Sequence, residues 1–187
     1  LLRKHLQNGR ITDISQPGLE RIVHIRIEHL DEMGDLRSKT LVIEIMGKHS
    51  NIIFCSEDGI IIDSIKRVSA AVSSLREVLP GSLFVAETQN KLDALSTDCA
   101  AFREALSANP QPLFKALYGS FTGISPILAQ ELCHRGGADA ELPAAALDEA
   151  AWQTLYNAFA EMTDAIRKEH FVPNIAYTAG KPVEFCA

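Results

Sequence analysis

Hydrophobic and polar residues alternate with a period of two in the first third of the chain. Within residues 20–28, Val23, Ile25 and Ile27 fall on one face of an extended strand, and histidine or charged side chains fall on the other. Residues 41–46 repeat this alternation. A period of two is typical of half-buried antiparallel strands, so both segments are predicted to be strands.

Three further segments extend this pattern to a meander of four or five strands. Residues 51–55 and 60–65 are β-branched runs that flank the turn sequence Ser56-Glu57-Asp58-Gly59, which is typical of a hairpin. A short strand is also expected at residues 9–14. The first 66 residues are therefore predicted to form an antiparallel sheet.

The position of one turn predicts which residues meet at the end of this sheet. If the turn after residues 20–28 is centred near Met33-Gly34, residue i pairs with about residue 67 − i. Arg21 then lies opposite Met46, and Glu20 lies opposite Gly47. Two separate sequence segments would share one end of the sheet.

Helical periodicity replaces the alternation between residues 92 and 170. The expected helices are one around Phe102 that stops at Asn109-Pro110, one over Leu113–Leu117, one from Ser125 to Arg135, and one from Asp148 to about Glu169. Ser125 is an N-cap with proline at the first helical position. The apolar stripe of the longest helix, which includes Trp152, predicts a packed core.

Residues 171–187 return to strand character as a predicted hairpin around Thr178-Ala179-Gly180-Lys181. The fold class is therefore α+β, with a helical domain inserted into an antiparallel β-rich domain. We expect a β-rich domain over residues 1–88, a helical domain over 89–169, and a β segment at 170–187 that belongs to the first domain.

Composition narrows the class of protein. The 187 residues are 47% hydrophobic, which excludes intrinsic disorder, and no apolar run approaches the roughly 18 residues of a membrane span. The net charge of −6 lies in residues 81–187, whereas residues 1–80 balance and hold four of the six histidines. A nucleic-acid partner would favour that first part. The chain begins at Leu1 within a helical pattern, so we expect a piece of a longer protein.

Candidate metal and catalytic chemistry is sparse. Cys55, Cys99, Cys133 and Cys186 are far apart and form no C-x-x-C pair, so we expect reduced, packed cysteines in the cytoplasm and no metal. Nucleophile-elbow, phosphate-loop, dinucleotide and zinc-protease motifs are all missing from the sequence. We therefore expect no cofactor and no catalytic residue.

Two segments have a composition suited to phosphate. Glu44-Ile45-Met46-Gly47-Lys48-His49-Ser50-Asn51 offers amides and side-chain donors at a sheet edge, where the alternative is a solvated hairpin loop. Thr122, Gly123, Ile124 and Ser125 join two predicted helices and resemble a helix–hairpin–helix. The second helix of such a hairpin can hold a phosphate at its N-terminus. The alternative there is a purely packed α-hairpin.

Five sequence blocks in order resemble the NFACT family, also called the RqcH or fibronectin-binding protein A family. They are Leu1–Ile11, Gln16–Val23, Glu44–Asn51, Ile62–Arg67 and Leu79–Gly81. The Glu-Ile-Met-Gly-Lys-His-Ser-Asn block is specific, and the resemblance covers essentially the whole chain. It implies an amino-terminal domain similar in fold to that of formamidopyrimidine DNA glycosylases, with an inserted helix–hairpin–helix domain.

The resemblance also implies a function in ribosome-associated quality control. The family binds tRNA, in particular alanyl-tRNA, and the large ribosomal subunit with a stalled peptidyl-tRNA. It supports addition of a carboxy-terminal alanine tail, while the ribosome forms the peptide bonds. The family's tRNA-engaging positions fall on Glu20, Arg21, Glu44, Ile45 and Met46, and Lys48 and His49 follow them. Glu20 stands where the family has aspartate.

Two other classes stay open. A surface adhesin that binds fibronectin would require an export route and exposed adhesive repeats, and the sequence shows neither. A glycosylase-like nucleic-acid enzyme would require a terminal amine or an acid at a flipped-base pocket. We expect a tRNA-binding protein that is not an enzyme and has no membrane partner.

Overall fold

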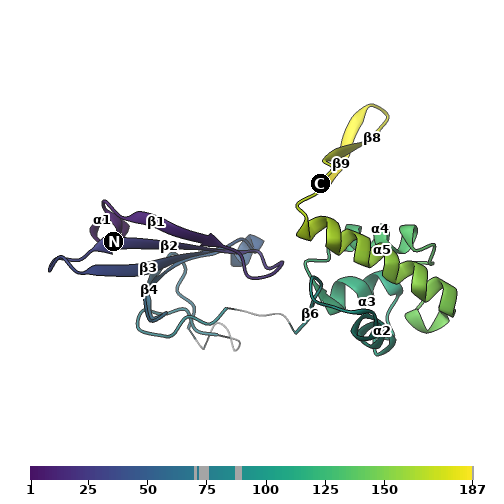
Figure 1. The fold of residues 1–187 in the computed structure, drawn as a ribbon, viewed down its shortest axis with the longest axis horizontal. Helices are drawn as coiled ribbons and strands as arrows, with labels where there is room; N and C mark the ends of the chain where they lie inside the picture. Colours follow the sequence, from purple (N-terminus) through teal and green to yellow (C-terminus); the bar gives the residue numbers. More distant parts are fainter. Residues whose placement is uncertain (70, 72–75, 87–89, 187) are drawn as a thin grey trace. The chain divides into compact units, whose positions relative to one another are not determined.

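The computed structural model describes residues 1–69, 71, 76–86 and 90–186. The chain divides into two compact units, Leu1–Gln89 and Asn90–Ala187 (Figure 1). The predicted boundary between residues 88 and 89 lies outside the described residues. Each unit buries its own set of apolar side chains.

The first unit is built on the antiparallel meander that the alternation predicts. Five strands lie in chain order in one sheet, and each pairs antiparallel with the next. Their bounds are Arg10–Ser15 (β1), Ile22–Leu30 (β2), Leu36–Glu44 (β3), Asn51–Ser56 (β4) and Ile61–Ser64 (β5). A short helix, α1 (Leu2–Leu6), precedes them. The predicted sheet is confirmed.

The register of the β2–β3 hairpin differs from the predicted one by a single residue. Ile22 pairs with Glu44, so the numbers of paired residues add to 66 instead of 67. The predicted pairing of Arg21 with Met46 is therefore wrong, and Ile45 takes that place. Because side chains alternate between the two faces of a sheet, Arg21 shares its face with Ile45.

The β2–β3 turn explains this shift. Asp31 accepts hydrogen bonds from the amides of Met33 and Asp35 at 2.9 Å each, and the Gly34 amide donates to the Asp31 carbonyl at 3.0 Å. Gly34 has a φ of 84°, which glycine adopts without the strain of a side chain. These bonds centre the turn on Met33, half a residue earlier than the sequence indicates.

The core of the first unit lies on the face of the sheet that carries Ile22. The cluster consists of Ile22, Val42, Ile53, Cys55, Ile61 and Val78. Residues 76–86 supply the cover, since Val78 exchanges backbone hydrogen bonds with Val68 at 2.7 and 3.0 Å and Phe84 packs against the cluster. Val23 and Ile25, which alternation places on the opposite face, are only half-buried.

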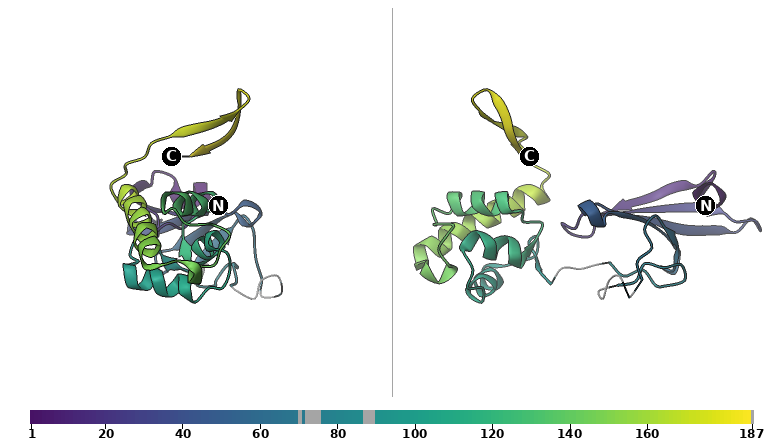
Figure 2. Two further views of the ribbon diagram at one scale, coloured as in Figure 1. Left: turned by 90° about the vertical axis from the view of Figure 1, so that its right-hand side faces the viewer. Right: turned by 180° about the vertical axis from the view of Figure 1, so that it is seen from behind.

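The second unit contains the predicted helices, each near its predicted position (Figures 1 and 2). Their bounds are Cys99–Ser107 (α2), Leu113–Ser120 (α3), Pro126–Arg135 (α4) and Glu149–Arg167 (α5). The Asp98, Ser125 and Asp148 side chains cap α2, α4 and α5 by accepting amides of the first turn. Among the described residues, no helix has the length and apolar character needed to cross a membrane.

Short elements complete the two units. In the second unit, the strands β6 (Leu92–Asp93) and β7 (Phe121–Thr122) pair in parallel. Single-turn 3₁₀ helices lie at Gly47–His49 (η1) in the first unit and at Ala144–Ala146 (η2) in the second.

Aromatic rings form the core of the second unit. Phe102 on α2 is fully buried. Its ring centroid lies 4.6 Å from that of Phe159 on α5 and 5.3 Å from that of Phe121. Trp152 and Tyr156 also face Phe102 from α5, at 6.5 and 5.5 Å. The predicted core stripe of the longest helix is confirmed by these contacts.

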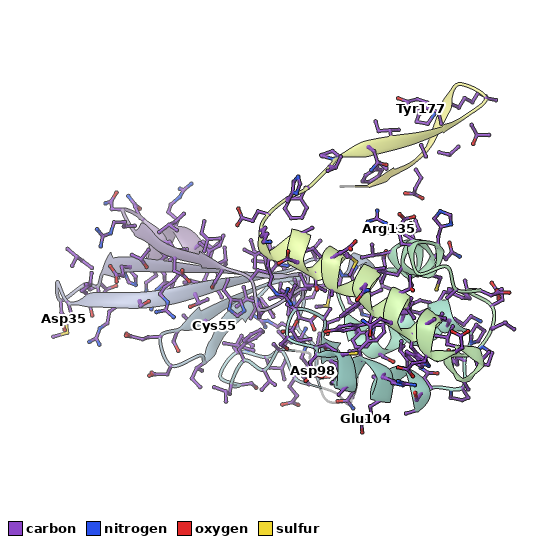
Figure 3. All side chains as sticks on the ribbon, turned by 45° about the vertical axis from the view of Figure 1, so that its right-hand side comes forward. Asp35, Cys55, Asp98, Glu104, Arg135 and Tyr177 are labelled. Carbon is purple, nitrogen blue, oxygen red and sulfur yellow. The ribbon has the colours of Figure 1, made fainter. Side chains whose placement is uncertain are left out.

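After α5, β8 (Asn174–Thr178) and β9 (Lys181–Cys186) form a hairpin, which is a two-stranded antiparallel sheet among the described residues. Figure 3 shows the labelled Tyr177 side chain on this hairpin, and 62% of Tyr177 is exposed. An isolated two-stranded hairpin is marginally stable in water. The assignment of residues 170–187 to the first domain stays a prediction.

Candidate nucleic-acid interface

Arg21 and Ile45 meet at the end of the sheet where β2 begins and β3 ends. The Ile45 amide donates a hydrogen bond to the Arg21 carbonyl at 2.8 Å, which prolongs the β2–β3 ladder by one residue. Both residues are exposed, and 56% of Ile45 is accessible. Glu20 is half-buried, and Gln16 fixes its carbonyl with a 2.7 Å hydrogen bond. The two segments expected to bind tRNA therefore share one end of the sheet.

The Glu44 carboxylate points into the first unit. Only 1% of Glu44 is exposed. Its two oxygens accept hydrogen bonds from Nη1 and Nη2 of Arg76 at 2.6 and 2.7 Å. Arg76 Nη1 also donates to the Val85 carbonyl at 3.2 Å. A direct contact between tRNA and this carboxylate would require the pair to open, so a role in shaping the interface suits Glu44 better.

The turn after β3 presents the basic part of the Glu44–Asn51 segment. Gly47 has a φ of 59° and opens η1, where Lys48 and His49 are exposed. The Met46 amide donates to the Ser50 hydroxyl at 2.9 Å and so closes the turn. Met46 itself is half-buried and packs against the core cluster. Lys48 and His49 are thus the side chains that this turn offers to a ligand.

Asn51, the last residue of the segment predicted to suit phosphate, and Lys66, which was not predicted as a site residue, complete this end of the sheet. Asn51, at the start of β4, is 6% exposed and hydrogen-bonds both the amide and the carbonyl of Lys66 at 2.9 Å. The Lys66 ammonium donates to the Lys48 carbonyl at 2.9 Å. A sequence signal could have identified Lys66, which lies just after β5. Because β5 pairs antiparallel with β4, the end of β5 lies beside the start of β4 and therefore beside the η1 turn.

The predicted phosphate-binding hairpin lies in the second unit, between α3 and α4. Ser125 uses its hydroxyl to accept the Leu128 amide at 3.2 Å, and Pro126 has no amide hydrogen. Ile124 is 6% exposed. These features reduce the donors that Thr122, Gly123, Ile124 and Ser125 can offer, and phosphate binding there stays a prediction.

Cysteine chemistry distinguishes two buried thiols from an exposed one. Burial raises the pKa of the Cys55 thiol to about 11 and that of the Cys133 thiol to about 11, whereas Cys99 is exposed. Among the residues that the structure describes, no three His, Cys, Asp or Glu side chains are grouped so that they could hold a metal ion.

We therefore predict that iodoacetamide at pH 8 modifies Cys99 first in the folded protein. A pKa raised from 9.0 to about 11 lowers the thiolate fraction of Cys55 and Cys133 by about 100-fold, and burial blocks access as well. Peptide mass mapping in a Cys186→Ser background would compare the three thiols, with urea-unfolded protein as the control. Equal native rates at the three sites would contradict the prediction.

Comparison with known proteins gives a family for this chain. The family model for the NFACT N-terminal and middle domains matches residues 1–187. The Rqc2 homologue RqcH of Bacillus subtilis is 34% identical over 183 residues, which is 97% of this chain and 30% of that protein. RqcH of Streptococcus suis is 43% identical over 86 residues, 46% of this chain and 16% of that protein. The chain thus spans less than a third of the length of these relatives.

Solved structures that are similar to this chain are named for fibrinogen or fibronectin binding. A fibrinogen-binding protein from Staphylococcus aureus is 31% identical with a TM-score of 0.76, over 98% of this chain and 63% of that chain. The N-terminal part of a fibronectin/fibrinogen-binding protein from Streptococcus suis is 30% identical with a TM-score of 0.70, over 94% and 59%. The match over residues 1–187, together with these relatives, shows that the chain belongs to the NFACT family.

Proposed function

We propose that this chain is a tRNA-binding part of a ribosome-associated quality-control factor. The single observation that carries the proposal is the convergence of Arg21, Ile45, Lys48 and His49 on one end of the sheet. Cationic side chains and backbone donors are the groups that hold a phosphate backbone. The relatives named RqcH support the same assignment.

The exposed residues at this sheet end have distinct roles in the proposal. The planar Arg21 guanidinium can bind a phosphate or a base edge with two parallel hydrogen bonds. Lys48 and His49 would meet neighbouring phosphates from the η1 turn. Glu20 would keep the negative charge of the family's aspartate beside Arg21, with its carboxylate one methylene further out. Glu44 and Met46 would shape the turn from inside the unit.

The proposed partners are alanyl-tRNA and the large ribosomal subunit with a stalled peptidyl-tRNA, in the cytoplasm. The chain would position tRNA for carboxy-terminal alanine tailing, and no bond-forming step is assigned to it because the ribosome forms the peptide bond. The hairpin at residues 122–125 would add a secondary phosphate contact, carried by few donors. The proposed helix–hairpin–helix and glycosylase-like descriptions of the two units belong to this proposal.

Replacing Arg21 with alanine tests the proposal. We expect tRNA affinity to fall by about 1–3 kcal/mol, or roughly 5- to 150-fold, since one charged contact is lost. Fluorescence anisotropy with labelled alanyl-tRNA at fixed salt would measure it, and circular dichroism would verify the fold. Arg10→Ala is the matched control, because Arg10 pairs with Glu28 at the opposite end of the sheet. If Arg21→Ala left the tRNA affinity unchanged, the assignment of this sheet end as the tRNA-binding site would be contradicted.

Fibronectin or fibrinogen binding is a second candidate function, favoured by the names of the solved relatives. The same wild-type protein and Arg21→Ala variant would be tested on immobilised fibronectin. Tight fibronectin binding by a folded protein that fails to bind tRNA would replace the first proposal by the second.

A further inference from the structure

We infer that Lys66, which follows β5 and whose ammonium reaches the η1 turn beside Lys48, is a further phosphate-binding residue of the interface. Neither the motif blocks nor the named relatives assign this residue a role. The inference rests on the proposed tRNA binding and extends the surface from the β2 and β3 ends to the chain that follows β5. The bound group would be a backbone phosphate of the tRNA.

The backbone at Lys66 is fixed by buried groups. Asn51 Nδ2 donates to the Lys66 carbonyl and Asn51 Oδ1 accepts the Lys66 amide, both at 2.9 Å. The same oxygen accepts the Ile52 amide at 3.0 Å. Ser64 Oγ adds a further 2.9 Å bond to the Lys66 carbonyl. Lysine side chains are flexible, but this one starts from a rigid base, which lowers the ordering cost of binding.

The Lys66 ammonium contacts the η1 turn, which carries Lys48. It donates to the Lys48 carbonyl at 2.9 Å. An ammonium has three donors, so further donors of this group remain for a ligand. The arrangement brings the Lys66 ammonium to the short turn that carries Lys48 and His49, so an anion bound at this turn would lie within reach of both lysines.

Within the described residues, the positive charges of Lys48 and Lys66 are not neutralised by a neighbouring carboxylate. The two basic residues that follow Lys66 in sequence have carboxylate partners: Arg67 pairs with Asp63 at 3.2 Å, and Arg76 pairs with Glu44. Within the ranges that the structure describes, neither Lys48 nor Lys66 has a carboxylate at ion-pair distance. An unpaired, positioned cation beside other cations is the electrostatic footprint expected for a phosphate contact.

The test is a salt titration of tRNA binding with Lys66→Met. The association constant for tRNA falls as salt rises, and the loss of one phosphate contact makes the slope of log K against log salt shallower by about 0.7–0.9. At 0.1 M salt this weakens binding by roughly 5- to 10-fold. Lys4→Met is the matched control. Lys4 is an exposed lysine 4.0 Å from Glu32, at the β2–β3 turn and so at the opposite end of the sheet. We expect Lys4→Met to leave slope and affinity as in the wild type.

The outcomes separate this inference from the proposed function. If the wild type binds tRNA and Arg21→Ala weakens binding, but Lys66→Met matches Lys4→Met, the inference is overturned and the proposed function stands. If Lys66→Met weakens binding to purified large subunits and leaves tRNA binding unchanged, the assignment to tRNA phosphate is also overturned. If the wild type binds no tRNA, the proposed function itself fails.

Lysine footprinting of the wild type decides the matter without any variant. An amine-reactive reagent modifies Lys66 and Lys4 in the free protein, and mass spectrometry gives the rate at each site. Saturating tRNA is expected to slow modification of Lys66 by at least about fivefold through direct contact while the rate at Lys4 is unchanged. Equal rates at Lys66 with and without bound tRNA would overturn the inference.

Discussion

Replacing Arg76 with methionine is expected to lower the free energy of unfolding of the first unit by about 3–5 kcal/mol. The Glu44 side chain is fully buried and that of Arg76 is 11% exposed. Two hydrogen bonds of 2.6 and 2.7 Å join them. Removing the guanidinium leaves a buried carboxylate without its cation, and that loss costs more than the intact pair contributes. Denaturant titration followed by circular dichroism would measure the change.

Two variants make this result specific to the buried pair. The double variant Glu44→Leu with Arg76→Met removes both charges, and we expect it to recover most of the lost stability. Arg37→Met breaks exposed ion pairs with Asp31 and Asp35 and should have a much smaller effect, because water screens such pairs. A loss for Arg76→Met no larger than that for Arg37→Met would contradict the burial of the pair.

Replacing Phe102 with alanine is expected to destabilise the second unit by about 3–5 kcal/mol, the range for a buried aromatic side chain. Phe102 is fully buried, and the rings of Phe121, Phe159, Trp152 and Tyr156 surround it. Its removal leaves a cavity at the centre of this cluster. The fluorescence of Trp152, the one tryptophan of the chain, reports unfolding of this unit during denaturant titration.

Phe171→Ala is the matched control for the core substitution. Phe171 follows α5 and is 52% exposed, so its truncation removes little buried surface and should leave the Trp152 transition in place. A Phe102→Ala variant with the wild-type midpoint would show that the ring cluster is not the core of this unit.

The strands and helices could be predicted because their signals are local. Alternation marked β2, and the Ser125-Pro126 start marked α4 within a residue. The register of the β2–β3 hairpin was harder to predict from the sequence, because it depends on where the Asp31 carboxylate closes the turn. A half-residue error in the turn centre becomes a full residue in the pairing, which reverses the faces of the opposed side chains.

The candidate site was predictable in part for a similar reason. The segments that carry Arg21 and Ile45 could be placed at one end of the sheet from hairpin geometry, since pairing along a meander follows chain order, although the exact pairing could not. The partner of Glu44 could not, because Arg76 lies 32 residues further on. In the predicted register Glu44 lies on the face opposite Ile22, and only the observed pairing of Ile22 with Glu44 puts this carboxylate on the core face. A carboxylate buried there requires a cation or a donor, so neither this requirement nor the residue that meets it could be predicted from the sequence.

The sequence by itself determined the elements, their order, the α+β class and the family, because period, caps, turn residues and motif blocks are all written along the chain. Only the tertiary structure decided which face of the sheet carries the core cluster, that Glu44 points inward, and that the Lys66 ammonium reaches the η1 turn. These features depend on segments distant in sequence, residues 76–86 above all. They pack onto the face that carries Ile22 and Val42, and not onto the face of Val23 and Ile25 that the local alternation favours.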